Sequence, residues 1–111
     1  MEPKPRRLLN YEKTDGVSPF ATWLDSLKDA KARAAIRVRL DRLALGMLGD
    51  HHNVGGGVWE LRIDFGPAYR LYYGEWKGYV VILLLGGTKR GQSRDIAAAK
   101  KYFDDFRRRN A

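Results

Sequence analysis

The alternation of hydrophobic and polar residues between positions 58 and 85 predicts three consecutive β-strands. In the first two, every second residue is hydrophobic, which is the pattern of a half-buried strand. These hydrophobic positions are Trp59, Leu61, Ile63, Tyr69, Leu71 and Tyr73. The predicted strands are Val58–Asp64, Ala68–Gly74 and Gly78–Leu85. The third is apolar on both faces, as in a strand that is covered on both sides, so it needs a second neighbour in the sheet.

Helical spacing of hydrophobic residues predicts two helices before these strands. Ser18 is a suitable N-cap and Pro19 a suitable first residue for a short helix. Asp29 caps a longer helix with an apolar stripe, and Gly46 ends it. The segment Met47–Gly57 contains three consecutive glycines and is expected to be a loop.

A strand at Arg7–Tyr11 and a helix from Ser93 to Arg108 complete the predicted elements. The N-terminal strand is the one candidate left for the second neighbour of the strand at 78–85. The expected fold is therefore α+β, in the order β-α-α-β-β-β-α, with a largely antiparallel four-stranded sheet packed against the helices. At 111 residues the chain is expected to form one domain, residues 1–111.

The hydrophobic pattern also predicts how the first two of these strands pair. Burying their hydrophobic residues on one face sets Arg62 directly opposite Arg70 on the other face. Like charges that lie opposite each other destabilise a hairpin. The pair therefore indicates an anion site, and phosphate matches the geometry of guanidinium groups. Because this face is turned away from the predicted core, Arg70→Ala is expected to abolish function without unfolding the protein.

Charge and composition narrow the class of partner. The chain has 21 Lys and Arg against 13 Asp and Glu, a net charge of +8 and a pI near 10.0. A small domain this basic usually binds a polyanion, either nucleic acid or an acidic protein. The absence of cysteine excludes disulfides and thiolate metal sites. No signal peptide or membrane-spanning run is apparent, so a cytoplasmic protein without membrane contact is expected.

Three motifs occur in order along the second half of the chain: ELRI at 60–63, GPxYR at 66–70 and GGxKxxQxxDI at 86–96. With the segments PFATWLDSL at 19–27 and ARAAIRVRLDRLALGMLGD at 32–50, they resemble the RelE/ParE superfamily of toxins from type II toxin–antitoxin modules. The resemblance is strongest to the HigB-like addiction module killer proteins, which are related to phage-derived toxins. It implies a small α+β domain like that of the microbial ribonucleases.

The resemblance also implies an activity and partners. The expected activity is that of a ribosome-dependent mRNA endoribonuclease (an mRNA interferase) that inhibits translation and needs neither metal nor cofactor. The expected partners are the ribosome, mRNA and a cognate HigA-like antitoxin with a helix-turn-helix domain. The toxin–antitoxin complex is expected to be hetero-oligomeric and to bind operator DNA through the antitoxin.

By resemblance, the catalytic residues are the four cations Arg62, Arg70, Lys89 and Arg90. Fixed cationic donors stabilise the charge that develops when the 2′-OH of RNA attacks the adjacent phosphorus. The chain differs from the RelE pattern at two positions. Ile96 stands where a tyrosine begins the terminal helix, and Glu60 replaces one of two basic residues on the strand. Glu60 and Asp64 are each two residues from Arg62 and are suited to orient it, to act as base, or simply to pair with the arginines.

Further residues are predicted to contact nucleic acid: Tyr72, Arg94, Lys100, Lys101 and His52. Tyr72 lies on the arginine face, where it would either stack on a base or line the edge of the core. His52 and its neighbour His51 would reach a phosphate only if their loop folds over the sheet, and otherwise they are plain loop residues. The histidine pair alone is weak support for a metal site. The triglycine lacks the strand–loop–helix context of a phosphate-binding loop.

Two other functions are compatible with the same fold. One is a ParE-like inhibitor that binds DNA gyrase and catalyses nothing, and the other is an inactive phage-derived relic. A cluster of basic residues on the sheet face is needed to cut RNA but not to block gyrase, so the four cations favour the endoribonuclease.

Overall fold

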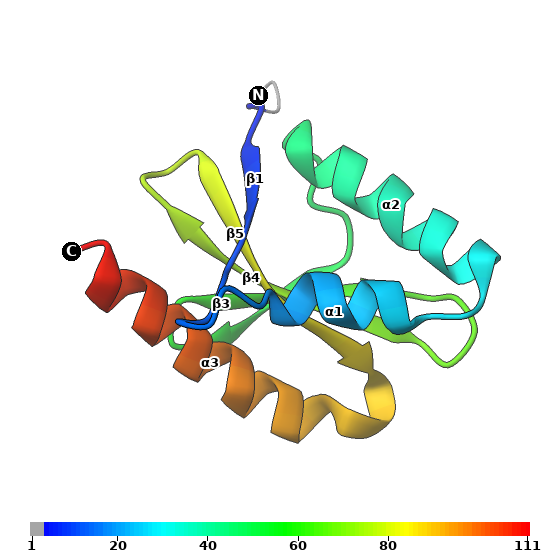
Figure 1. The fold of residues 1–111 in the computed structure, drawn as a ribbon. Helices are drawn as coiled ribbons and strands as arrows, with labels where there is room; N and C mark the ends of the chain where they lie inside the picture. The colour runs from blue at the N-terminus through cyan, green and yellow to red at the C-terminus, as the bar shows by residue number, and fades with distance from the viewer. Residues whose placement is uncertain (1–3) are drawn as a thin grey trace.

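The computed structural model describes residues 4–111 and contains one mixed five-stranded sheet with the strand order β1-β5-β4-β3-β2 (Figure 1). The strands are β1 (Arg7–Asn10), β2 (His51–Gly55), β3 (Val58–Ile63), β4 (Tyr69–Trp76) and β5 (Val80–Thr88). The helices are α1 (Pro19–Ser26), α2 (Ala30–Ala44), the short η1 (Lys89–Gly91) and α3 (Gln92–Arg109). Strand β1 runs parallel to β5, and the other neighbours are antiparallel. The predicted α+β class is confirmed.

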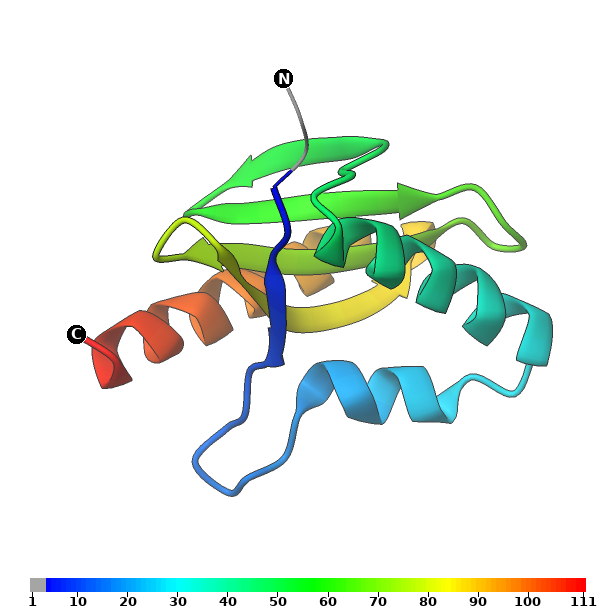
Figure 2. The ribbon, with the colours of Figure 1, turned by 90° about the horizontal axis from the view of Figure 1, so that it is seen from above.

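The prediction of four strands was wrong, because residues 51–55 form the edge strand β2 instead of a loop. Gly55, Gly56 and Gly57 have φ angles of 93°, 63° and 80°, which are costly for residues with a side chain, and they make the tight turn that folds β2 back on β3. Figure 2 shows the resulting hairpin at one edge of the sheet. The sequence HHNVG carries no hydrophobic alternation, so its strand character was not apparent.

The predicted register of the central strands is confirmed. Arg62 lies opposite Arg70, and β5 has β1 as its second neighbour, with Leu9 opposite Ile82. The other predicted pairs of the hairpin are Ile63 with Tyr69 and Leu61 with Leu71. The period-two pattern was therefore sufficient to determine which face each side chain occupies.

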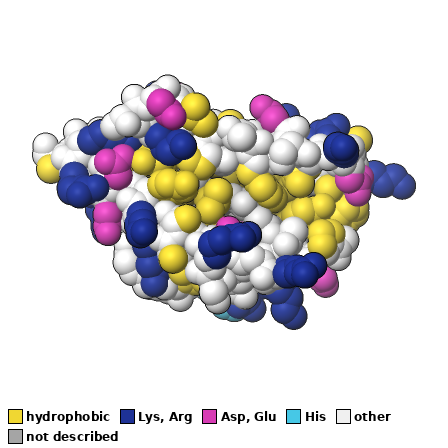
Figure 3. Space-filling view, turned by 60° about the horizontal axis from the view of Figure 1, so that its bottom comes forward, with side chains coloured by type: hydrophobic (Ala, Val, Ile, Leu, Met, Phe, Trp, Pro, Cys, Tyr) yellow, Lys and Arg dark blue, Asp and Glu magenta, His cyan; other side chains and the backbone are white. Residues whose placement is uncertain are grey.

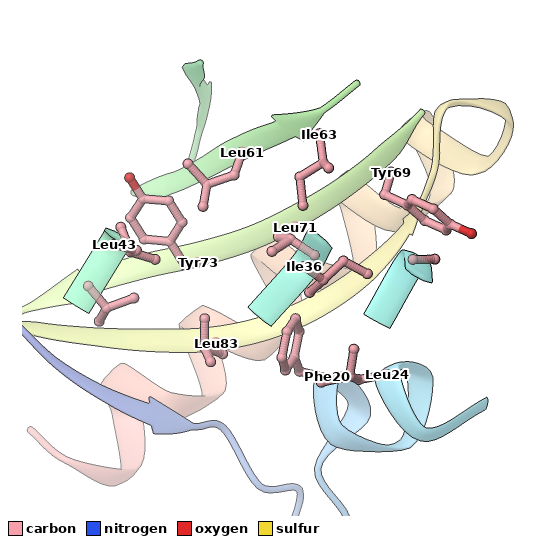
Figure 4. Packing of buried hydrophobic residues seen from close by; sticks show 12 residues of the cluster. Phe20, Leu24, Ile36, Leu43, Leu61, Ile63, Tyr69, Leu71, Tyr73 and Leu83 are labelled. Carbon is pink, nitrogen blue, oxygen red and sulfur yellow. The ribbon is translucent and has the colours of Figure 1, made fainter. Parts of the chain in front are cut away.

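Both faces of the sheet are covered, with α1 and α2 on one side and α3 on the other (Figure 2). The face toward α1 and α2 holds the larger core cluster, part of which Figure 4 shows. Its fully or nearly buried members include Phe20, Ile36, Leu43, Leu61, Leu71, Tyr73 and Val81. The face toward α3 buries Val58, Tyr72, Ile82, Leu84, Ala99 and Phe103. This double cover explains why β5 is apolar on both sides.

The N-termini of α1 and α2 are capped as the sequence predicts. Ser18 Oγ accepts a hydrogen bond from the backbone N–H of Ala21 at 3.1 Å, and Asp29 Oδ1 accepts from that of Lys31 at 2.9 Å. Each cap satisfies a backbone donor that has no partner within its helix.

The C-terminal half of α3 is fixed to the end of β1. The Tyr11 hydroxyl donates to Asp105 at 2.7 Å, and the Tyr11 ring stacks on Tyr102. Burial and the nearby carboxylate raise the pKa of Tyr11 to about 12. This contact helps to fix the direction in which α3 crosses the sheet.

Within residues 4–111, no helix is long and apolar enough to cross a bilayer.

The packing of α2 against the sheet predicts how much the free energy of unfolding falls when one leucine is replaced by alanine. Leu43 is fully buried, whereas Leu45, two residues later, is 59% exposed. Leu43→Ala should lower the free energy of unfolding by about 2–5 kcal/mol through lost burial and a cavity. Leu45→Ala should change it by less than about 0.5 kcal/mol. Urea unfolding followed by tryptophan fluorescence measures both, and equal effects would contradict the packing described.

Candidate functional site

A buried carboxylate lies at the centre of the sheet face that α3 covers. Glu60 of β3 is fully buried, and its Oε1 accepts a hydrogen bond from Arg62 Nε at 2.9 Å. Its Oε2 accepts from Gln92 Nε2, at the start of α3, at 2.8 Å. Burial alone would raise the pKa of Glu60, but the hydrogen bonds from Arg62 and Gln92 outweigh it and keep that pKa below its usual value. Glu60 is therefore a carboxylate at neutral pH and too enclosed to contact a substrate.

The two opposed arginines differ sharply in accessibility. The Arg62 side chain is 39% exposed, whereas that of Arg70 is 9% exposed. Arg70 Nε lies 4.0 Å from Glu60 Oε1 and is buried without a hydrogen-bond partner among the described residues. The expectation that Arg70 lies on a face turned away from the core was wrong, because α3 covers this face and Arg70 is buried. Glu60 thus faces two guanidiniums, of which that of Arg62 is the accessible one.

A third arginine, from the opposite side of the sheet, holds the backbone at this point. Arg39 of α2 donates to the carbonyl oxygen of Arg62 at 2.8 Å and to that of Leu48 at 3.2 Å. Its burial lowers its pKa from the usual arginine value. The local sequence does not distinguish Arg39 from the other basic residues of α2.

Strand β2 brings a histidine to the same face, and Asp50, the residue before the strand, contacts it. His52 is the cross-strand neighbour of Glu60, and its Nε2 lies 2.7 Å from Asp50 Oδ1. The backbone N–H of Arg62 donates to the carbonyl oxygen of Asp50 at 3.0 Å, which places this residue beside the exposed arginine. His51 points to the opposite face, where its ring lies 5.3 Å from that of Trp59. The interpretation of the histidines as loop residues was wrong, since both belong to a strand.

A hollow of about 730 Å³ lies next to this cluster, at the end of β5. It is lined by Trp23 of α1 and by residues 86–95, which include Lys89, Arg90 and Arg94. A Cβ on Gly86 would lie 2.1 Å from the Trp23 ring, so only glycine lets the indole lie against the strand. Figure 3 turns the lower side of Figure 1 toward the viewer and shows hydrophobic side chains in a hollowed band with Lys and Arg on either side.

The predicted catalytic residues thus lie in two adjoining groups. Arg62 and Arg70 surround Glu60, whereas Lys89 and Arg90 line the hollow, whose walls include neither of the first two. The groups adjoin at Gly87, which pairs with Arg70 across the strands and packs so closely against Asp95 that a Cβ would lie 2.1 Å from its Oδ2. Burial raises the pKa of Asp95 above the usual value.

The residues predicted to contact nucleic acid differ in whether the structure leaves them accessible. Tyr72 is fully buried beneath α3, and burial raises its pKa, so its ring is not available to stack on a base. Lys100 lies over the β2–β3 turn, where a Cβ on Gly55 would be 3.2 Å from its Nζ. Arg94 and Lys101 are exposed on α3. Within the described part of the chain, no three His, Cys, Asp or Glu side chains gather in a way that could hold a metal.

The fold and this site define a class: a small, basic α+β protein with an arginine–glutamate ion cluster between a sheet and its terminal helix. The model of the family described as "Phage derived protein Gp49-like" matches residues 22–104, and the chain belongs to this family. The family is associated with toxin–antitoxin modules and is related to the RelE-like toxins. An uncharacterized protein of Haemophilus influenzae is 47% identical over 81 residues, which cover 73% of this chain and 82% of that relative.

The buried ion cluster predicts a large cost for removing one charge. Glu60→Gln leaves Arg70 buried without a counterion, so the free energy of unfolding at pH 7 should fall by roughly 3–5 kcal/mol. The folded-state pKa of Glu60 is lowered, so its contribution is complete above the unfolded value of about 4.3 and is lost as the pH falls through the folded value. The difference in the free energy of unfolding between wild type and Glu60→Gln should therefore become smaller from pH 7 toward pH 3.

Urea unfolding at several pH values measures this difference. Glu75→Gln is the matched control, because Glu75 pairs with Arg6 at the surface and its side chain is 37% exposed. The control should lose less than about 1 kcal/mol. A loss of the same size in both variants would mean that Glu60 does not hold the cluster together.

Proposed function

We propose that this protein is the toxin of a type II toxin–antitoxin module and acts as a ribosome-dependent mRNA endoribonuclease. The observation that carries the proposal is the placement of Arg62 and Arg70 opposite each other around the single carboxylate of Glu60. Glu60 alone does not balance the two guanidiniums, and Arg62, with the exposed Asp50 as its other nearby carboxylate, is accessible on the sheet face. A phosphate group would accept charge-assisted hydrogen bonds from it.

In this proposal the arginines have different tasks. Arg62 is exposed enough to donate to the scissile phosphate, whereas Arg70 lies beneath and strengthens the positive potential. Lys89 and Arg90 of the adjoining hollow, with Arg94 beside them, bind the phosphates of the neighbouring nucleotides. The RNA strand then passes over the start of α3, from the arginine cluster into the hollow.

The reaction that this charge supports is transesterification within the RNA. The 2′-OH attacks the adjacent phosphorus, the bond to the 5′ oxygen breaks, and the products carry a 2′,3′-cyclic phosphate and a 5′-OH. Cationic donors aimed at the phosphorane oxygens stabilise the transition state more than the ground state. The chemistry requires no metal.

We further propose that a cognate helix-turn-helix antitoxin neutralises this toxin. The net charge of +8 and the accessible Arg62 favour a partner that presents acidic side chains. The complex would be hetero-oligomeric and would bind operator DNA through the antitoxin. Co-purification of the two proteins from a strain that expresses both, followed by an operator-binding assay, tests this part of the proposal.

A non-catalytic inhibitor of DNA gyrase is the second candidate. The burial of Arg70 favours it, because a guanidinium that is 9% exposed does not contact a phosphate directly. A gyrase supercoiling assay with the purified protein distinguishes the two functions.

The test of the first proposal is cleavage of a defined, end-labelled mRNA by the purified protein with and without programmed ribosomes. Cuts that appear only with ribosomes and leave a 2′,3′-cyclic phosphate are expected. If the protein still arrests growth but cleaves mRNA in neither condition, the endoribonuclease proposal fails and the target is gyrase or another molecule.

The variant Arg62→Ala tests whether Arg62 acts on the scissile phosphate or only adds to the positive charge that attracts RNA. It should lower the rate of ribosome-dependent cleavage by about 10²–10³-fold, the loss expected for one donor to a developing anion. Arg37→Ala is the matched control, because Arg37 is exposed on α2, on the other side of the sheet. Single-turnover kinetics measure both rates, and an equal effect of the two variants would reduce the role of Arg62 to general attraction.

A further inference from the structure

The proposed reaction needs a group that removes the proton from the 2′-OH, and the arginine cluster does not contain one. A guanidinium group donates hydrogen bonds and accepts none, which excludes Arg62 and Arg70 as the base. Glu60 is fully buried and both of its oxygens accept hydrogen bonds. At the position where the resembling toxins carry a tyrosine, this chain has Ile96. The proton acceptor must therefore come from another element that reaches the same face.

Strand β2 supplies such a group. His52 lies directly across from Glu60, so its side chain projects from the same face as Arg62, and adjacent cross-strand side chains start about 5 Å apart. Its side chain is 43% exposed, and its Nε2 is held by Asp50 Oδ1 at 2.7 Å. A carboxylate that accepts the hydrogen bond from Nε2–H leaves Nδ1 as the free acceptor. This is the arrangement of a general base whose tautomer and orientation are set by an acid.

We propose that His52, oriented by Asp50, is the general base of the reaction. The inference rests on the proposed endoribonuclease function and identifies a residue that the family resemblance does not assign. Asp50 is a positioning residue, because it acts through His52 and does not contact the RNA. The pair becomes possible only because residues 51–55 form a strand, which brings the imidazole to the edge of the arginine cluster.

The 2′-OH proton passes to Nδ1 of His52 while the 2′ oxygen forms its bond to phosphorus. The bond between phosphorus and the 5′ oxygen breaks, and the 5′ oxygen takes a proton from water. The imidazolium returns its proton to the resulting hydroxide, and Asp50 stabilises the imidazolium while it exists. The charge of the phosphorane meanwhile faces Arg62.

Several charged groups face His52 and bear on its pH dependence. The acidic groups are Asp50 and Glu60, and Arg62, diagonal to His52 on β3, is the basic one. From α3, Lys100 extends over the far end of β2 at Gly55. Since the base must be unprotonated to act, the rate should rise with pH in the histidine range, between about pH 5 and 8.

The experiment compares wild type, His52→Gln and His51→Gln in single-turnover cleavage on programmed ribosomes across this pH range. His52→Gln should lower the rate by about 10²–10⁴-fold, the usual contribution of a general base, and should remove the rise with pH. His51→Gln makes the same chemical change one residue earlier, on the opposite face beside Trp59, and should leave rate and pH profile unchanged. Circular dichroism and a ribosome-binding assay confirm that each variant is folded and binds.

A fourth protein, His52→Ala, distinguishes a chemical from a structural role. Added imidazole should restore part of its cleavage rate, because the free base occupies the space of the missing ring. Restoration would support the proposal, and absence of restoration together with a pH profile like that of wild type would overturn it. If wild type cleaves and His52→Gln cleaves equally well, the general-base assignment fails while the endoribonuclease stands. If wild type does not cleave, both fail together.

Discussion

The ion pairing around Glu60 is the interaction on which the arrangement of the site depends. Strand register sets Arg62 and Arg70 side by side, and without an anion between them their charges would repel. Glu60 provides that anion from within the sheet, and through Gln92 it also fixes the start of α3. Because a buried charge is costly unless it is paired, the carboxylate and its donors hold one another in place. The sheet face and the terminal helix therefore form one unit.

The arginine cluster around Glu60 and the cationic hollow at the end of β5 are the two halves of the site, and this unit places them side by side. Glu60 alone does not balance the two guanidiniums, and Arg62 lies at the accessible edge of the cluster. On one side, β2 presents His52 to this point. On the other side, Gly87 connects Arg70 to the cationic hollow, where Lys89 lies. A substrate phosphate at Arg62 would thus have the proposed base, His52, on one side and the cations of the hollow on the other.

Much of the fold was predictable from local patterns, and the parts that were not depend on tertiary contacts. The period of two in β3 and β4 determined the pairing of Arg62 with Arg70, because slipping by one residue would expose the core. Strand β2 was missed because a polar edge strand has no hydrophobic period, and its glycines are equally typical of a loop. The burial of Tyr72 and Arg70 results from the path of α3, which no local pattern specifies. The sequence showed that Glu60 lies near Arg62. It did not distinguish a carboxylate that orients the arginine from one that acts as general base.

Glu60 is a carboxylate that the groups around it hold ionised, and the site is organised around its charge. Titration of its side-chain carboxyl carbon by ¹³C nuclear magnetic resonance, in a protein labelled at glutamate, tests this directly. A midpoint below the usual glutamate value of about 4.3 is expected, because the hydrogen bonds from Arg62 and Gln92 favour the charged form. A midpoint at or above that value would mean that burial outweighs the hydrogen bonds from Arg62 and Gln92, and the arginine cluster would then lack the anion that organises it.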